Sequence, residues 1–351
     1  MRIASLVSRW TIVRNRPLVD SVARLCIEVF LFCDAYFEPV ESNLCEGVLM
    51  SRIDVFAHVL PPRFYERMKE VEPAIPQRYA FFNNPVLTNM ELRRSHWDGQ
   101  TRQVISHVNA LPEDYVDPAT AAELCAMGND ELLEMLRANR DMFEAAVLMV
   151  PMNNIDEAVR IVRERVTEDP DVVGIQIFTR ALGKSIADEE FRPLFAALAQ
   201  TGTPAWLHPV FDLRKPDNNL VFSWEYELSQ AMLQMVQANL FKELPTLKVI
   251  VHHAGGMAPF FAGRIDRIMT SEQAADMRKF YVDTAILGNP RALDLAADFY
   301  GIDHVLFGTD APLGILPAGA TAEISQAIED MHVSGQDKQA IFEDNYRRLV
   351  G

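Results

Sequence analysis

From residue 53 onward, short apolar runs rich in β-branched and aromatic residues alternate with longer amphipathic stretches. This alternation is typical of repeated βα units around a parallel sheet. The apolar runs predict strands that end near His58, His107, Pro151, Arg180, Pro209, His253, Ala285 and Asp310. The amphipathic stretches predict helices over 156–167, 188–200, 222–240, 258–269, 290–299 and 320–331. We therefore predict an α/β fold, a closed (β/α)8 barrel of the TIM type.

Residues 61–103 interrupt this alternation. The segment is polar, broken by prolines and longer than a single βα unit requires. Long segments of this kind are often functional. We predict an insertion over the barrel mouth, where it would act as a lid.

Residues 1–49 differ from the rest because they lack a clear helical or strand period. Met50 stands just before the first strong strand-like run, which suggests a translation start at that position. One interpretation is an N-terminal extension that packs on the barrel or on a neighbouring subunit. The other, which we favour, is a start codon assigned too far upstream. In either case a single barrel domain is expected over 50–351.

Composition narrows the choice of partners. The chain has 351 residues, 49% of them hydrophobic, and a formal net charge of −16 without a cluster of Lys and Arg. Such a chain lacks the electrostatic footprint of a protein that binds nucleic acid or anionic lipid. No apolar run reaches the ~20 residues of a spanning helix, and the first residues do not form a signal peptide. Without a CxxC pair among its four cysteines, the chain is expected to be cytoplasmic.

Four residues that can bind metal end separate apolar runs. They are His58, His208, His253 and Asp310. In a βα barrel the carboxyl ends of the strands meet at one rim, so these side chains are expected to converge. A carboxylate that closes an apolar strand also needs a partner to offset its desolvation. Three imidazoles and a carboxylate form a ligand set suited to Zn²⁺ or a similar divalent ion.

The motifs around these residues carry a resemblance to the amidohydrolase superfamily. Within it the chain resembles the branch that contains aminocarboxymuconate-semialdehyde decarboxylase and γ-resorcylate decarboxylase. The similarity runs from about residue 52 to the end of the chain and does not extend before Met50. The matching segments are 54–58, 206–209, 252–259 followed by Gly263-Arg264, 307–312 and the closing helix 341–349.

The resemblance implies one divalent metal ion, zinc or alternatively manganese, held by His58, His208 and Asp310. It implies that His253 lies near the metal as a catalytic group or an additional ligand. We choose His253 because, in the family, one residue separates the corresponding histidine from the Gly-Gly pair. Since strand alternation sends neighbouring residues to opposite faces, His252 is expected to face the helical layer.

One position departs from the family pattern. The family usually shows His-x-His on the first strand, whereas this chain has Phe56-Ala57-His58. With fewer protein ligands the metal keeps more open positions, which suits a chelating substrate, and Phe56 would line the site as an apolar wall. The alternative is a decayed site in a barrel without catalytic function.

The resemblance implies a metal-dependent, non-oxidative decarboxylase that acts on an aromatic or unsaturated (hydroxy)carboxylic acid. Asp310 or His253 would supply the proton. The alternative is a hydrolase that uses an activated water on a lactone, an amide or a C–C bond. Phe56, Arg180 and Trp206 are the candidates for contact with the small-molecule carboxylic acid. The alternatives are that Arg180 is a surface residue or forms a salt bridge at the rim and that Trp206 simply fills the barrel. We also expect a homo-oligomer, either a dimer or a tetramer.

Overall fold

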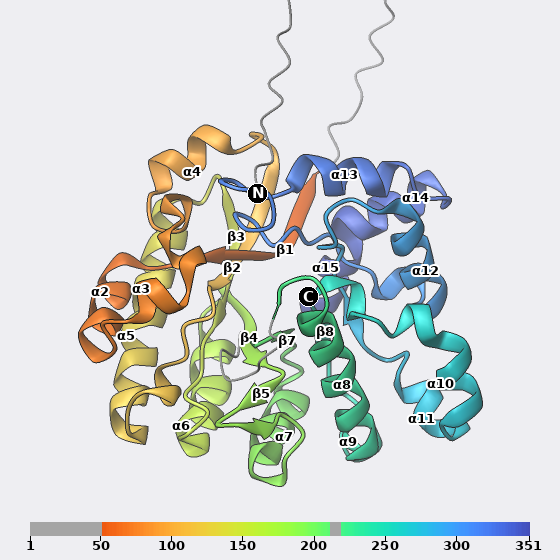
Figure 1. Ribbon diagram of the computed structural model, residues 1–351, viewed down its shortest axis with the longest axis horizontal. Helices are drawn as coiled ribbons and strands as arrows, with labels where there is room; N and C mark the ends of the chain where they lie inside the picture. The colour runs from red at the N-terminus through yellow and green to blue at the C-terminus, as the bar shows by residue number, and fades with distance from the viewer. Residues whose placement is uncertain (1–50, 211–218) are drawn as a thin grey trace, which may run out of the picture. The chain divides into compact units, whose positions relative to one another are not determined.

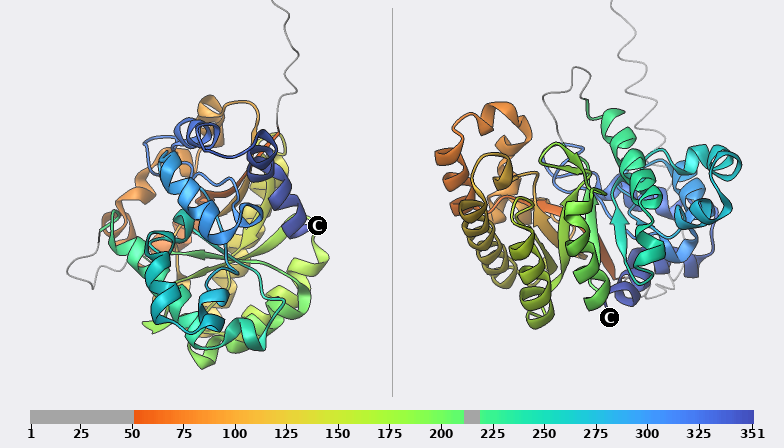
Figure 2. Two further views of the ribbon diagram at one scale, coloured as in Figure 1. Left: turned by 90° about the vertical axis from the view of Figure 1, so that its right-hand side faces the viewer. Right: turned by 90° about the horizontal axis from the view of Figure 1, so that it is seen from below.

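The computed structural model describes residues 51–210 and 219–351. The N-terminal extension predicted over residues 1–49 lies outside the described residues. Residues 50–351 form one compact unit. The helices surround a curled sheet at its centre (Figure 1, Figure 2).

The central sheet has seven parallel strands, hydrogen-bonded in the order β1-β2-β3-β4-β7-β8-β9. Each strand is adjacent to the next strand of this sheet along the chain, as right-handed βα units require. The mixed α/β fold with a curled parallel sheet is consistent with a TIM-type barrel. The strands are β1 (Arg52–Val59), β2 (Thr101–His107), β3 (Phe143–Leu148), β4 (Val172–Phe178), β7 (Ala205–His208), β8 (Val249–Val251) and β9 (Tyr281–Val282).

The segment 305–311 lies between the first and last strands of this sheet. The Leu306 N–H donates to the Val282 carbonyl at 2.8 Å, and the Asp310 N–H donates to the Phe56 carbonyl at 2.9 Å. Parallel bridges join the two ends of the same segment to β9 and β1. Through these bonds the segment holds Asp310 at the same rim as the end of β1.

Several predicted strand ends shift in the structure. β4 ends at Phe178, and Arg180 instead belongs to a two-stranded antiparallel ribbon, β5 (Arg180–Ala181) with β6 (Lys184–Ser185). β8 ends at Val251, two residues before the predicted His253. The apolar runs therefore continue past the hydrogen-bonded ladders into the loops.

The helices include all six predicted stretches. The chain also contains a 21-residue helix, α5, that the periodicity did not predict. Its buried face carries Gly128, Asn129 and Glu131 among the apolar residues, which blurs the apolar stripe. The helices are α2 (Pro62–Val71), α3 (Ile75–Arg78), α4 (Met90–His96), α5 (Pro118–Ala138), α6 (Ile155–Arg160), α7 (Arg192–Thr201), α8 (Ser223–Gln237), α9 (Leu240–Glu243), α10 (Ala262–Ile268), α11 (Ser271–Asp276), α12 (Pro290–Tyr300), α13 (Thr321–Glu329), α14 (Gly335–Gln339) and α15 (Asn345–Val350).

Residues 61–103 form α2, α3, α4 and short 3-10 turns before they enter β2. Phe64 and Met68 of α2 pack with residues of α5 in a separate apolar cluster. The backbone N–H groups of Arg63 and Phe64 donate to the buried Glu131 carboxylate of α5, which satisfies the first turn of α2. These contacts attach the segment to the helical layer beside β1, and its predicted role as a lid stays a prediction.

The inside of the curled sheet is filled by a small apolar cluster. Trp206 of β7 is fully buried in it, and its indole Nε1 donates to the Val55 carbonyl at 2.8 Å. A Cβ added at Gly174 would lie 2.2 Å from the Trp206 ring, so only glycine leaves room for this indole. Trp206 therefore occupies the core, where its one polar atom already has a partner, and it contributes no surface to a substrate.

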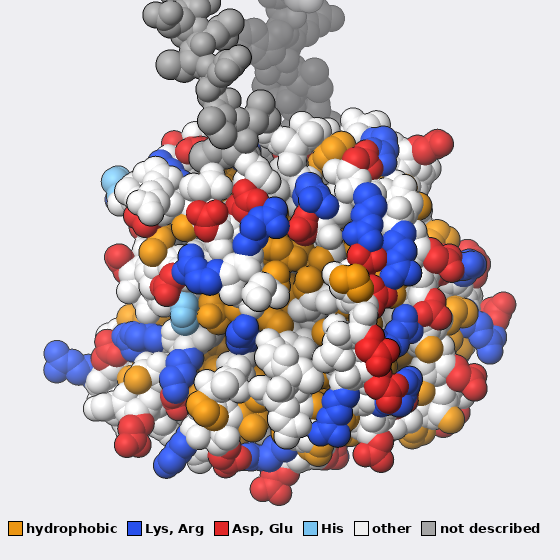
Figure 3. Space-filling view, turned by 180° about the vertical axis from the view of Figure 1, so that it is seen from behind, with side chains coloured by type: hydrophobic (Ala, Val, Ile, Leu, Met, Phe, Trp, Pro, Cys, Tyr) orange, Lys and Arg blue, Asp and Glu red, His pale blue; other side chains and the backbone are white. Residues whose placement is uncertain are grey.

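The surface carries charges of both signs. On the face in Figure 3, Lys and Arg side chains are interspersed with Asp and Glu. Among the residues that the structure describes, no helix is long and apolar enough to cross a membrane.

Candidate metal centre

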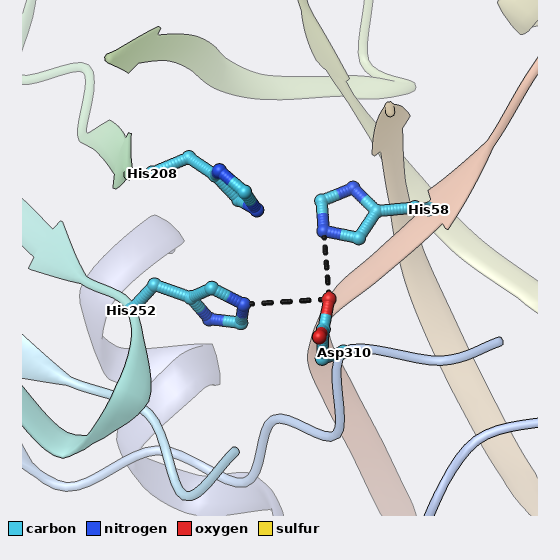
Figure 4. Close-up of side chains that lie close together, drawn as sticks. All are labelled: His58, His208, His252 and Asp310. Atoms are coloured by element: carbon cyan, nitrogen blue, oxygen red, sulfur yellow. Dashed lines mark ion pairs between the residues drawn. The ribbon is translucent and has the colours of Figure 1, made fainter. Parts of the chain in front are cut away.

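Four buried side chains converge at the carboxyl rim of the sheet: His58, His208, His252 and Asp310. His58 lies near the end of β1, His208 ends β7, and His252 directly follows β8. Asp310 lies near the end of the segment 305–311, which pairs with β1 and β9. The side chains point toward one another from these separate elements (Figure 4).

The Asp310 carboxylate lies at the centre of the group. Its Oδ1 is 3.2 Å from Nε2 of His58 and 3.5 Å from Nε2 of His252. The ring centroid of His208 lies 5.0 Å from that of His58 and 4.9 Å from that of His252. One ligand atom from each of the four residues lies within 4.8 Å of the others. A single cation can therefore contact all four after small side-chain adjustments.

A second layer of partners orients the three imidazoles. Nδ1 of His58 lies 3.0 Å from Oγ of Ser106, and Nδ1 of His208 lies 2.7 Å from the Pro209 carbonyl. Nδ1 of His252 pairs with the buried Asp283 carboxylate. When Nδ1 carries the proton in each ring, Nε2 presents its lone pair to the centre. This arrangement is typical of metal-binding histidines.

Burial keeps two of the rings neutral. It lowers the pKa of His58, although the nearby Asp310 carboxylate acts in the opposite direction. Burial, together with the rings of His252 and His58, holds the pKa of His208 well below its usual range. Neutral imidazoles are the form that binds metal, so neither ring must lose a proton first.

Asp310 and His252 form a buried ion pair. Burial alone would raise the pKa of Asp310, but His252 and His58 hold it well below its usual range. Burial likewise acts to lower the pKa of His252, but the carboxylates of Asp283 and Asp310 raise it to about 10. A divalent cation that bound here would replace the proton on His252.

A further observation indicates that these four residues suit a metal ion. Nε2 of His58, Nε2 of His252 and Oδ1 of Asp310 are buried and face one another at ion-pair distances, and none of the three makes a hydrogen bond of good geometry. Buried polar atoms that lack partners are costly, and three of them facing one point indicate a missing partner. A divalent cation would satisfy all three at once.

The structure corrects the expected orientation of His252. We expected it to face the helical layer, yet its Nε2 belongs to the group around Asp310. Ile250 packs in the cluster inside the sheet, and alternation carries the residue two positions later to the same side.

His253 lies beside the cluster in a different setting. Its Nδ1 is 2.8 Å from Oε1 of Glu225 on α8, and its Nε2 is 4.0 Å from Oδ2 of Asp310. The sharp turn after β8 brings it there, since His253 and Ala254 both have φ of 53°. Glu225 orients the ring so that Nε2 faces Asp310, and the catalytic role predicted for His253 stays a prediction.

Phe56 packs directly against the cluster. Its ring is stacked on that of His252 with centroids 4.0 Å apart, and its side chain is buried. It also contacts His58 and His208, with ring centroids 5.6 and 5.8 Å away. Phe56 therefore forms an apolar wall beside the three imidazoles, and its predicted contact with the substrate stays a prediction.

Arg180 lies outside the cluster. Its Nη2 is 3.2 Å from Oε1 of the buried Glu227 on α8. The guanidinium therefore already has an anionic partner, and its predicted contact with the substrate carboxylate stays a prediction.

A buried polar network behind His58 was not predicted from the sequence. Nη1 of Arg93 donates to the His58 carbonyl at 2.7 Å, and its Nε and Nη2 donate to Oε1 of Gln103 at 3.0 and 2.7 Å. Oδ2 of Asp54 accepts from Gln103 at 3.3 Å, and its Oδ1 accepts from the Thr309 N–H at 3.0 Å. Burial raises the pKa of Asp54 to about 7 despite these bonds. The network joins the strand of His58 to the backbone next to Asp310.

The Phe56→His variant tests whether the missing histidine is an adaptation. Because the ring already lies against His252, an imidazole here would add a ligand, and we expect metal affinity to rise about 10-fold or more. We expect slower turnover of a chelating acid, since fewer coordination positions stay open. Metal titration and steady-state kinetics measure both effects, with the exposed Phe260→His as the control. Faster turnover with tighter metal binding would identify Phe56 as a defect.

Comparison with known proteins supports the resemblance seen in the motifs. The model of the amidohydrolase family matches residues 99–351. A 6-methylsalicylic acid decarboxylase from Penicillium expansum is 30% identical over 160 residues, which is 40% of this chain and 48% of that protein. A 2-amino-3-carboxymuconate-6-semialdehyde decarboxylase from Dictyostelium discoideum is 24% identical over 316 residues, 78% of this chain and 85% of that protein. The chain thus spans about half of the first relative and most of the second.

Solved structures show the same fold. A 5-carboxyvanillate decarboxylase from Novosphingobium aromaticivorans, in complex with manganese and 4-hydroxy-3-methoxy-5-nitrobenzoic acid, superposes with a TM-score of 0.73. It is 19% identical, and the match covers 86% of this chain and 96% of that chain. Because the family match extends over more than half of the sequence, the protein belongs to the amidohydrolase family.

Proposed function

We propose that the protein is a metal-dependent, non-oxidative decarboxylase of an aromatic or unsaturated (hydroxy)carboxylic acid. The observation that carries this proposal is the buried group of three imidazoles and one carboxylate, whose facing atoms lack hydrogen-bond partners. The decarboxylases among the relatives and the solved structures favour this reaction over others that such a group could support.

His58, His208, His252 and Asp310 would hold the metal ion. When bound, the ion would act as a Lewis acid that neutralises the substrate carboxylate and a neighbouring oxygen. We propose one divalent ion, with zinc as the first choice from the ligand set and manganese as the alternative that the solved relative suggests.

Proton delivery falls to Asp310 and His253. Glu225 engages Nδ1 of His253, so Nε2 is the nitrogen that faces Asp310. Either side chain would transfer a proton to the ring carbon that bears the carboxylate; Asp310, which is ionised in the free site, would first take that proton from the hydroxyl next to the substrate carboxylate. The C–C bond would then break, its electron pair would return to the ring, and CO₂ would leave.

Two finer features also belong to the proposal. The segment 305–311 would serve as the eighth strand that closes a (β/α)8 barrel, and residues 61–103 would cover its mouth. Nδ2 of Asn84, which lies in the segment 61–103, donates to the carbonyls of Pro312 and Pro317, close in sequence to Asp310.

We further propose a cytoplasmic homo-oligomer that acts on small-molecule acids.

Metal analysis together with a CO₂-release screen tests the function. We expect the purified protein to contain about one divalent ion per chain and to release CO₂ from at least one hydroxybenzoate or related acid. Loss of activity with a chelator and its return with added metal would support the proposal. Hydration or hydrolysis products without CO₂ would instead support the hydrolase alternative, and absence of bound metal under replete conditions would support a decayed site.

A further inference from the structure

A small cavity lies beside the metal centre, at the ends of β2, β3 and β4. The space open to the centre of a water molecule is about 10 Å³, which is room for one water-sized group. Phe178 is shared by the cavity and the cluster: it lines the cavity, and its ring centroid lies 5.7 Å from that of His208. Its other lining side chains include His107, Glu113, Met149 and Gln176.

Three side chains in this lining have buried polar atoms without hydrogen-bond partners. They are Oε2 of Glu113, Oε1 of Gln176 and the ring nitrogens of His107, whose ring meets the Gly128 backbone without a hydrogen bond of good geometry. Each of these residues is more than nine-tenths buried. The metal centre does not use these atoms, and native proteins rarely leave such groups unsatisfied. Their convergence on one cavity indicates that a polar group occupies it.

The protonation states of Glu113 and His107 indicate which kind of polar group suits the cavity. Burial raises the pKa of Glu113 to about 8, so at neutral pH its carboxyl group is mostly protonated and donates. Burial lowers the pKa of His107 to about 3, so its ring is neutral and offers one donor and one acceptor. Oε1 of Gln176 accepts. The lining therefore suits an uncharged group that both donates and accepts, and it has no cationic side chain to pair with an anion.

We propose that His107, Glu113 and Gln176 form a specificity subsite that binds one uncharged hydroxyl group of the substrate and rejects a second carboxylate. A hydroxyl oxygen fits the volume of one water, whereas a carboxylate is larger and would be buried without a counter-charge. The inference rests on the proposed decarboxylase function. It restricts that function to monocarboxylic acids with a hydroxyl group directed away from the metal.

A matched series of 2-hydroxybenzoates tests the subsite. At each ring position in turn, the acid carries hydrogen, hydroxyl, methyl or a second carboxylate. We expect one position at which hydroxyl raises kcat/KM over hydrogen and methyl by on the order of 10²-fold, because a site built to bind a hydroxyl rejects analogues that lack it. The dicarboxylates should be the poorest substrates. Calorimetric Kd values for the same series should follow the same order.

Variants assign the preference to these residues. Gln176→Met and Glu113→Met should reduce the hydroxyl preference at least tenfold, whereas Glu113→Gln, which keeps an uncharged donor, should retain most of it. Ser325→Ala on α13 is the control, because Ser325 Oγ is also buried without a partner but does not line this cavity. If one methionine variant does not fold, the other variant and the wild-type substrate series still test whether the subsite binds a hydroxyl group.

Three outcomes would overturn the inference. They are equal kcat/KM or Kd for hydroxyl and methyl at every position, a dicarboxylate as the best ligand, and an unchanged preference in both methionine variants. Absence of CO₂ from every acid would contradict the decarboxylase function, and the Kd series would then still decide whether the subsite binds a hydroxyl.

Discussion

The Asp310→Asn variant is expected to release CO₂ at least ~10³-fold more slowly than the wild type while it stays folded. Oδ1 of Asp310 faces Nε2 of both His58 and His252, at 3.2 and 3.5 Å. Asparagine keeps the shape of the side chain but removes the negative charge that attracts a cation and the group that can carry the proton. CO₂ release, bound metal per chain and circular dichroism measure the three parts of this expectation.

Asp294→Asn is the matched control for this variant. Asp294 also pairs with an imidazole, since its Oδ2 lies 2.7 Å from Nδ1 of His332, but that pair is at the surface. We expect normal metal content and turnover in the control. An Asp310→Asn protein that kept its metal and released CO₂ within tenfold of the wild-type rate would contradict the assigned site.

The second large effect is expected for Arg93→Met. Arg93 is buried, and it joins the His58 carbonyl to Gln103 and Asp54. Removing one member of a buried charged network leaves its partners unsatisfied, which typically costs about 3–5 kcal/mol. We expect a loss of that order in the free energy of unfolding, together with weaker metal binding, because the strand that carries His58 loses its anchor. Denaturant titration and metal titration measure the two losses.

Arg94→Met separates this network from the general effect of losing an arginine on α4. Arg94 is the next residue on the same helix, but it is exposed and pairs with Asp141. Exposed ion pairs contribute little to stability, so the control should unfold at the wild-type denaturant concentration. Equal losses in both variants would show that the buried network has no special role.

His58, His208 and Asp310 were identified from the sequence because each closes an apolar run. In a βα fold, the residue that ends such a run lies at the carboxyl rim of the sheet. The sequence pattern alone therefore predicts that these side chains lie close together. The family match over residues 99–351 covers the motifs that contain His208 and Asp310. The βα alternation likewise predicted the curled parallel sheet. The structure differs from the expectation in the strand ends, in the eighth strand, where the segment 305–311 makes only isolated bridges, and in helices that were not predicted, such as α5 and α11.

The choice between His252 and His253 depended on the tertiary structure. Alternation applies only while a strand is extended, and β8 ends at Val251 before a turn with positive φ at His253. Which of the two faces inward follows from Ile250, whose side chain packs inside the sheet. Ile250 packs against residues of other strands, and such a contact cannot be recognised from the neighbouring sequence.

The sequence by itself therefore determined the βα fold class, the family and three of the four side chains that converge on the metal centre, because these follow from local periodicity and strand ends. Only the tertiary structure decided the surroundings that tune them. Asp283 directly follows β9, Glu225 lies on α8 and Arg93 lies on α4. Each meets the site through a contact between distant segments. Such contacts depend on how the elements pack, and packing is a property of the whole fold that no local pattern encodes.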